Sequence, residues 1–307
     1  MKTGILGQLS PFSRILFSLL LTLLSLVVFF LVGILLAIPI FHINLFSNLT
    51  ILTDYSSPIT VVLLKYLQII QSIGLFLIPP MLAAYFFENN CLSFLKLDQS
   101  SRGYIFLITL ILMFTALPFI NWLVSVNEMM KLPVYFKGIE DWMKTSEAEA
   151  AKLTEVFLDV KSLGGLLFNL LMIATLPAIG EELMFRGLFQ RLLKDWLKNI
   201  HVAIFISAFF FAAMHLQFYG FLPRMMLGVL FGYLFFWTGS IWVPVFAHFI
   251  NNGAAVVVSY LGKTGAFQGD YEQFGATENG WFILASILFT GLFLLIIYGS
   301  RNRKYDP

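Results

Sequence analysis

The chain carries long apolar runs separated by short polar segments. Crossing the roughly 30 Å hydrocarbon core of a membrane takes about 20 apolar residues in a helix. By that measure the pattern predicts eight transmembrane helices, with approximate limits 15–41, 60–87, 103–125, 162–190, 200–218, 221–237, 240–261 and 280–299. The first run is longer than the apolar part of a signal peptide and lacks a small-residue cleavage site, so we expect a retained helix. The predicted fold class is all-α, a polytopic membrane helix bundle.

The composition agrees with this class. Of the 307 residues, 59% are hydrophobic and 12% are charged, and the mean hydropathy is +0.86. These values exclude an ordinary soluble domain. The formal net charge of +2 gives no sign of a nucleic-acid partner. The single cysteine, Cys91, excludes an intrachain disulfide and a thiolate metal site.

The distribution of lysine and arginine predicts the orientation, because these residues concentrate in short cytoplasmic loops. With eight spans, both termini and every even-numbered loop share one side of the membrane. The opposite short loops hold Arg224 and Lys263, and Lys65 lies at the edge of a span. We therefore expect a multi-pass protein of a bacterial cytoplasmic membrane, surrounded by lipid, with both termini cytoplasmic. The side of the termini collects the larger set, namely Lys2, Arg14, Lys96, Arg102, Arg191, Lys194, Lys198, Arg301, Arg303 and Lys304.

One long polar segment, 126–161, interrupts the apolar pattern. Residues 145–160 have the composition of a helix, and Ser146 with Glu149 matches a capping box. Two interpretations are open, a solvated surface helix, which we favour, and a gate for substrate. We divide the chain into three parts: the first three spans with this segment, spans four to seven, and a loop with the last span and a basic tail. Their limits are 1–160, 161–262 and 263–307.

Seven polar residues stand in the apolar spans of the second half of the chain. An ionisable group at the centre of a spanning helix costs roughly 2.5 kcal/mol or more, so such residues usually face a partner or a water-filled cavity. If the spans are continuous α-helices, the helix rise places the first glutamate and first histidine about 15 and 21 Å deep, and the second histidine and the second asparagine about 12 and 18 Å deep. Three spans thus bring polar groups to one layer. The seven are Glu181, Glu182, Arg186, His215, His248, Asn251 and Asn252.

The residue types in this layer suit the hydrolysis of an amide bond. A carboxylate beside a neutral histidine can activate water as a general base, and Glu181 with His215 fits that role. A second histidine and an amide can donate hydrogen bonds to a developing oxyanion, and His248 with Asn252 fits this role.

The remaining charged pair is predicted to orient the site. Glu182 and Arg186 are four residues apart and share one helix face, whereas Glu181 points about 100° away and can face another neighbour. Pro177 and Gly180, just before the glutamates, either kink the span and free backbone groups for a substrate or ease helix packing. We favour the packing interpretation.

Other chemistries are open to the same residues. Two imidazoles and one carboxylate are a zinc ligand set in hydrolases, so Glu181, His215 and His248 leave a divalent metal such as zinc possible as a cofactor. The zincin signature, a Gly-x-Ser-x-Gly motif and two aspartates in separate spans are all absent from the sequence. Two other function classes are a non-proteolytic scaffold or regulator and a proton-coupled transporter. The transporter is disfavoured because matching broken helices in two halves are missing.

Taken together, three motifs resemble those of the CPBP intramembrane proteases. This family includes the type II CAAX prenyl endopeptidases and bacterial relatives tied to bacteriocin processing and immunity. The motifs are Glu-Glu-x-x-x-Arg at 181–186, Phe-x-x-x-His at 211–215 and His-x-x-x-Asn at 248–252, without a departure from the family pattern. The resemblance covers roughly residues 165–260.

The resemblance implies an intramembrane peptidase of the metalloprotease or the glutamate type. Its substrate would be a membrane-associated protein or peptide, either prenylated or a peptide precursor. In the family the first glutamate and first histidine activate water, and the later histidine and asparagine stabilise the oxyanion. Carried over, these residues are Glu181, His215, His248 and Asn252, and the residues that orient the site are Glu182 and Arg186.

Overall fold

The structure is a computed structural model that describes residues 4–46, 49–88, 90–130, 132–267 and 274–301. The regular elements over these ranges are helices, which confirms the predicted all-α membrane bundle. Within the described ranges, seven helices are long and apolar enough to cross a membrane. They are Pro11–Phe41, Pro58–Phe87, Gly103–Glu128, Leu163–Leu197, Phe221–Thr238, Trp242–Lys263 and Gly280–Gly299.

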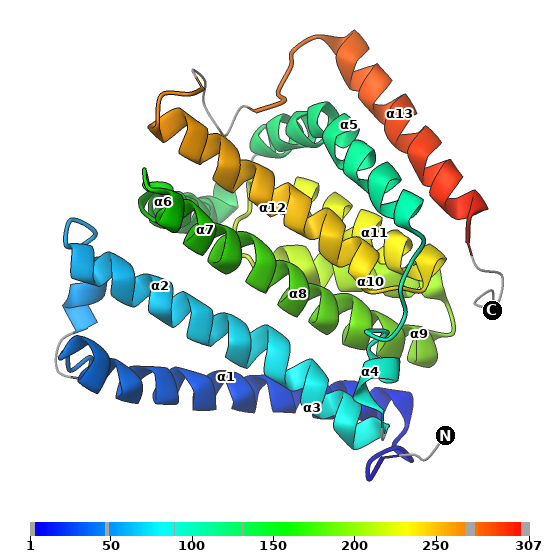
Figure 1. Cartoon of the computed structure of the whole chain (residues 1–307), viewed down its shortest axis with the longest axis horizontal. Helices are drawn as coiled ribbons and strands as arrows, with labels where there is room; N and C mark the ends of the chain where they lie inside the picture. Colours follow the sequence, from blue (N-terminus) through cyan, green and yellow to red (C-terminus); the bar gives the residue numbers. More distant parts are fainter. Residues whose placement is uncertain (1–3, 47–48, 89, 131, 268–273, 302–307) are drawn as a thin grey trace.

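Two of these spans are composite, and the others are single helices (Figure 1). The single helices are α1 (Pro11–Phe41), α5 (Gly103–Glu128), α11 (Phe221–Thr238), α12 (Trp242–Lys263) and α13 (Gly280–Gly299). The second span joins α2 (Pro58–Ser72), η2 (Ile73–Leu77) and α3 (Ile78–Phe87). The fourth joins α7 (Leu163–Asn169), η4 (Leu170–Thr175), α8 (Leu176–Glu182), η5 (Leu183–Gln190) and α9 (Arg191–Leu197). Short helices in the connections are η1 (Leu49–Thr53), α4 (Cys91–Phe94) and η3 (Val134–Phe136).

The composite spans contain π-helical segments, η2, η4 and η5. Two of them lie just before prolines, with η2 preceding Pro79 and η4 preceding Pro177. A proline has no amide hydrogen, and its ring clashes with the carbonyl one turn earlier, so a wider turn relieves the conflict. The expectation of a continuous α-helix through the fourth span is therefore wrong. The predicted depth of Glu181 assumed the rise per residue of an α-helix, and this rise does not hold along the π-helical parts of the span.

The predicted fifth span, 200–218, is shorter than expected. Its helix, α10 (Ile200–Ala213), has 14 residues, about 21 Å of rise, and falls short of the length of the seven spans. Met214 and His215 form a turn, and Leu216 has φ of 51°, in the left-handed region that ends a helix. His215 therefore lies just beyond the helix. With α10 counted as a pass, α1 begins and α13 ends at the same end of the bundle (Figure 1), whereas the cytoplasmic location of the termini stays a prediction.

The fourth span lies at the centre of the bundle (Figure 1). It contacts η2 and α3 on one side, and α10 and α12 on the other. Gly180 allows the fourth span to approach η2 closely, since a Cβ atom at this position would lie 2.9 Å from Phe76 Cβ. This close approach agrees with the packing interpretation of Gly180. The division of the chain into three parts stays a prediction.

The long polar segment forms α6 (Lys137–Leu158). This helix begins at Lys137 rather than at residue 145, because η3 leads directly into its first turn. Ser146 and Glu149 therefore lie inside the helix, and the predicted capping box is wrong. Phe136 stands at the N-cap position without a side-chain hydrogen bond to the first turn.

Candidate active site

Glu182 stands at the centre of a buried hydrogen-bonded cluster. Its Oε1 atom accepts a hydrogen bond of 2.7 Å from Nη1 of Arg186 and one of 2.9 Å from Nδ1 of His248. Glu182 is 0% exposed and Arg186 is 1% exposed. The ion pair expected from the four-residue spacing is therefore present, and it reaches across to α12 through His248.

Arg186 is enclosed by α10 and α11. Its Nη2 atom donates to the carbonyl oxygen of Gly228 at 2.9 Å. The guanidinium lies over the rings of Phe211 and Phe231, with centroid distances of 4.8 and 5.4 Å. Aromatic faces attract a cation, most strongly where it is desolvated. The positive charge is thus held by a carboxylate, a carbonyl and two rings.

Gln190, one turn after Arg186, also donates a hydrogen bond to a glycine carbonyl of α11. Nε2 of Gln190 donates to the carbonyl oxygen of Gly232 at 3.2 Å. None of Gln190, Gly228 and Gly232 was singled out from the sequence. Their spacing could have predicted this contact between the helices. Arg186 and Gln190 are four residues apart and share one helix face, and the same holds for Gly228 and Gly232. The glycines expose their carbonyls to the facing side chains.

Replacing Gly228 by alanine is expected to destabilise the protein by about 1–3 kcal/mol, the usual range for overpacking. A Cβ atom there would lie 2.9 Å from Ala208 Cβ and 3.3 Å from Phe211 Cδ1, so α10 and α11 would have to separate. Thermal unfolding in detergent measures the effect. Gly291→Ala is the matched control, because a Cβ there meets no atom of the described residues within 4 Å. Equal melting temperatures for the two variants contradict the expectation.

Glu181 lies on the other side of the His248 ring. Its Oε2 atom is 3.9 Å from Nε2 of His248 and accepts no hydrogen bond from the described residues. The ring of His248 stacks on Phe231, with a centroid distance of 5.3 Å and an interplanar angle of 27°. Buried polar atoms are nearly always hydrogen-bonded, so an exception indicates a functional role or an ordered water. Glu181 therefore offers a carboxylate oxygen beside an imidazole.

His215 follows α10 and is oriented by its own helix. Its Nδ1 atom bonds the carbonyl oxygen of Phe211 at 2.9 Å. The Phe211 ring lies 5.2 Å from the His215 ring and 5.9 Å from the His248 ring. His215 is exposed, and no hydrogen bond joins it to Glu181 within the described part of the chain. The two residues predicted to activate water thus share a region, without direct contact.

Asn252 is oriented by two hydrogen bonds. Its Nδ2 atom donates to the carbonyl oxygen of Ile173 at 3.2 Å, and its Oδ1 atom accepts from Nδ2 of Asn251 at 3.1 Å. In an α-helix the Ile173 carbonyl would receive the amide hydrogen of residue 177, which is Pro177 and has none. Pro177 thus frees the backbone carbonyl to which Asn252 binds. One N–H of the Asn252 amide is left for another acceptor.

The predicted metal ligands do not fit a metal ion. In the described residues no group of three or more His, Cys, Asp or Glu side chains is close enough to hold one, which applies to Glu181, His215 and His248. Nδ1 of His248 is engaged by Glu182, and Nε2 of the same ring faces Glu181 at 3.9 Å.

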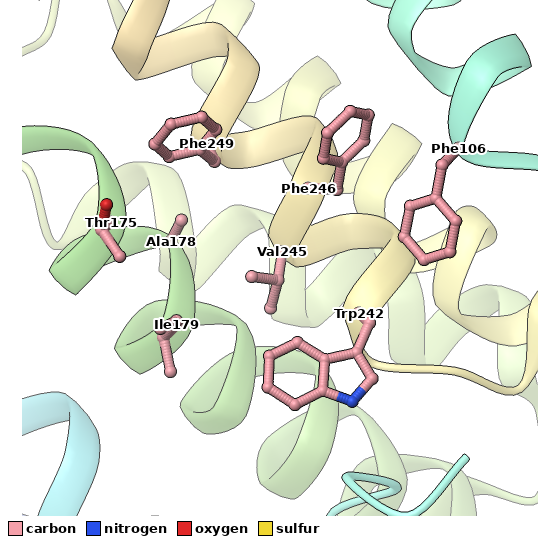
Figure 2. A pocket seen from close by; sticks show the side chains of 8 residues that line it. All are labelled: Phe106, Thr175, Ala178, Ile179, Trp242, Val245, Phe246 and Phe249. Carbon is pink, nitrogen blue, oxygen red and sulfur yellow. The ribbon is translucent and has the colours of Figure 1, made fainter. Parts of the chain in front are cut away.

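An apolar cavity of about 420 Å³ lies between the fourth span, α12 and α5 (Figure 2). Figure 2 shows side chains of the fourth span, α12 and α5 around it. Ala178 stands one turn before Glu181, and Val245 one turn before His248, although neither polar residue itself lines the cavity. The lining residues are Phe106, Thr175, Ala178, Ile179, Trp242, Val245, Phe246 and Phe249.

The residues of this cluster lie in the part of the chain that is similar to a known protein family. Residues 163–254 match the family described as "Type II CAAX prenyl endopeptidase Rce1-like". "Uncharacterized protein YpbD" of Bacillus subtilis (strain 168) is 29% identical over 86 residues, which are 27% of this chain and 41% of that protein. The chain thus spans about two fifths of the length of this relative. No solved structure matches the chain. The matched range holds all three motifs, so residues 163–254 of this membrane protein are similar to the Rce1-like family, in agreement with the resemblance that the motifs carry.

Proposed function

We propose that this chain is an intramembrane endopeptidase that hydrolyses a peptide bond of a membrane-associated protein or peptide. One observation carries the proposal. A buried carboxylate oxygen of Glu181 lies 3.9 Å from Nε2 of His248 and accepts no hydrogen bond from the described residues. The similarity of residues 163–254 to the Rce1-like family supports peptidase chemistry over a purely structural role for this cluster.

We assign the activation of water to Glu181 and His215. Because Nδ1 of His215 bonds the Phe211 carbonyl, Nε2 is the atom of the neutral ring that can accept a proton. A water between the two residues, with Glu181 as its second hydrogen-bond partner, gives up one proton to Nε2 of His215 as its oxygen attacks the substrate carbonyl carbon. That proton passes to the leaving amine when the carbon–nitrogen bond breaks, which restores the base.

We assign the stabilisation of the oxyanion to His248 and Asn252. A His248 ring with protons on both nitrogens can donate from Nε2 while Nδ1 keeps its bond to Glu182. Asn252 contributes the N–H that its bond to Ile173 leaves free. Glu182 and Arg186 act as orienting residues, because they fix the position of His248 from the side away from Glu181.

The apolar cavity supports a membrane-associated substrate. Its lining residues Ala178 and Val245 lie one turn before Glu181 and His248, and all of its lining except Thr175 is hydrophobic. An apolar part of the substrate can lie in the cavity while the scissile bond lies at the polar cluster. Binding sites for apolar groups commonly combine such a lining with a few polar residues that fix orientation.

Replacing Pro177 by alanine is expected to slow cleavage about three- to tenfold, the equivalent of about 0.6–1.4 kcal/mol for one hydrogen bond. The alanine regains an amide hydrogen that competes with Asn252 for the carbonyl of Ile173. Initial rates of peptide release measure this effect. The melting temperature should not fall, because alanine is the better helix former. Pro118→Ala, within α5, is the matched control, and a wild-type rate for Pro177→Ala contradicts the expectation.

The proposed function is tested by expressing the wild type and Glu181→Ala in the same host. Mass spectrometry of the membrane fraction identifies new peptide termini. We expect cleavage at defined peptide bonds in the wild type, and its loss in the variant at equal expression. Identical sets of termini in the two strains would contradict a peptidase and favour the scaffold interpretation.

A further inference from the structure

The loop that carries His215 is covered by α6, which belongs to none of the three motifs. The ring of Trp142 packs against Phe218 with a centroid distance of 5.2 Å. The backbone N–H of Tyr219 donates to Oε2 of Glu147 at 3.3 Å. Two side chains of α6, about one and a half helical turns apart, therefore contact the loop within four residues of His215.

The same loop is held from its other side by α5. Nδ2 of Asn127 donates to the carbonyl oxygen of Phe218 at 2.8 Å, and Oδ1 accepts from the backbone N–H of Leu222 at 2.6 Å. Asn127 is buried. Loop backbone groups that do not bond one another need partners elsewhere. Here the partners are side chains from two helices far away in the sequence.

The far end of α6 is fixed to the bundle by a buried cation. Nζ of Lys65 donates to the carbonyl oxygen of Phe157 and to Oδ1 of Asn169, both at 3.0 Å. Asn169 also donates to the Phe157 carbonyl, at 2.8 Å. A positive charge at a helix C-terminus is favourable, because the last carbonyls point toward it. Helix α6 is thus fixed at its C-terminal end and contacts the His215 loop near its middle.

We propose that α6 is a clamp for the His215 loop and that Glu147 is a positioning residue for the reaction. The role rests on the proposed function, since it concerns the base that activates water. The α-helical hydrogen-bond pattern ends at Ala213, Leu216 turns into the left-handed region, and the bonds inside the loop are the short-range ones from His215 to Ala212, from Leu216 to Ala213 and from Phe221 to Phe218, with Arg224 bound to Gln217. Glu147 fixes Tyr219 and Asn127 fixes Phe218, so the backbone that follows His215 has one position relative to Glu181.

The first test measures the clamp without any substrate. Hydrogen exchange of the Tyr219 amide is followed by mass spectrometry in the purified full chain. Glu147→Ala should speed exchange about tenfold, as the loss of one hydrogen bond to a charged acceptor predicts. Glu147→Gln keeps an acceptor and should retain most of the protection. Glu149→Ala, an exposed glutamate on the same helix, is the matched control and should exchange like the wild type.

The second test measures cleavage of the peptide bonds found for the wild type. Glu147→Ala should lower kcat about tenfold with little change in KM, and Glu147→Gln should restore most of the rate. Wild-type exchange at Tyr219 in Glu147→Ala overturns the clamp, whether or not the protein is a peptidase. Faster exchange with an unchanged kcat overturns the positioning of His215. If Glu147→Ala melts well below the wild type, Trp142→Ala replaces it, because that variant removes only the ring contact with Phe218.

Discussion

Glu181→Ala is expected to abolish peptide-bond hydrolysis while the protein stays folded. Glu181 and His215 together activate the water, and general-base action contributes about 10²–10⁴-fold to the rate, so removing the carboxylate should leave cleavage near background. Folding should survive, because Oε2 of Glu181 accepts no hydrogen bond from the described residues and lies 3.9 Å from His248. Rates of peptide release and melting temperatures of the purified proteins give the two readouts.

The neighbouring glutamate supplies a matched comparison for this prediction. Glu182 accepts hydrogen bonds from both Arg186 and His248, so Glu182→Gln should lower the melting temperature as well as the rate. Glu181→Gln should lower the rate alone. Wild-type cleavage by purified Glu181→Ala would remove the catalytic assignment. Equal losses of stability in the two glutamine variants would remove the division of roles between the glutamates.

Arg186→Ala is expected to destabilise the protein by about 3–5 kcal/mol, the usual effect of leaving one charge of a buried pair without its partner. Glu182 is 0% exposed and would lose the 2.7 Å bond to Nη1. The Gly228 carbonyl would lose its donor as well. Thermal unfolding in detergent measures the loss, with Arg102→Ala, an exposed arginine, as the matched control.

Two further variants separate charge from geometry in this pair. Arg186→Lys keeps the charge but has no fork of two nitrogens to reach Glu182 and Gly228 together, so it should fall between the wild type and Arg186→Ala. The double variant Glu182→Gln with Arg186→Met should be more stable than Arg186→Ala, because no buried charge is left alone. If Arg186→Ala melts like Arg102→Ala, the orienting role of the pair is wrong.

The spans and the ion pair of Glu182 with Arg186 could be predicted because they depend on local patterns. Apolar runs of membrane length located the helices, and the four-residue spacing of Glu182 and Arg186 gave their ion pair. Within the fourth span, α-helical spacing held for this pair even though η5 is π-helical. The early end of α10 was missed, because the residues after Ala213 are apolar enough to extend the predicted span.

Contacts between distant segments could not be predicted, since they depend on how each helix is rotated in the bundle. The sequence could not say that His248 binds Glu182 at 2.9 Å and faces Glu181 at 3.9 Å. The contact of Asn252 with the carbonyl freed by Pro177 also crosses between helices. Helix α6 was expected, but its contacts with the His215 loop were not, and both interpretations of this helix left Glu147 without a role.

Oxygen tracing during cleavage is the most direct test of whether Glu181 activates a water for hydrolysis. The purified wild type is incorporated into liposomes with its cleavable membrane substrate in water enriched in oxygen-18, and the new carboxyl terminus is weighed. Hydrolysis by activated water predicts one heavy oxygen in that carboxyl group in a single turnover, and no product from Glu181→Ala under the same conditions. A product of equal yield from Glu181→Ala, or a new terminus without heavy oxygen, would contradict the account.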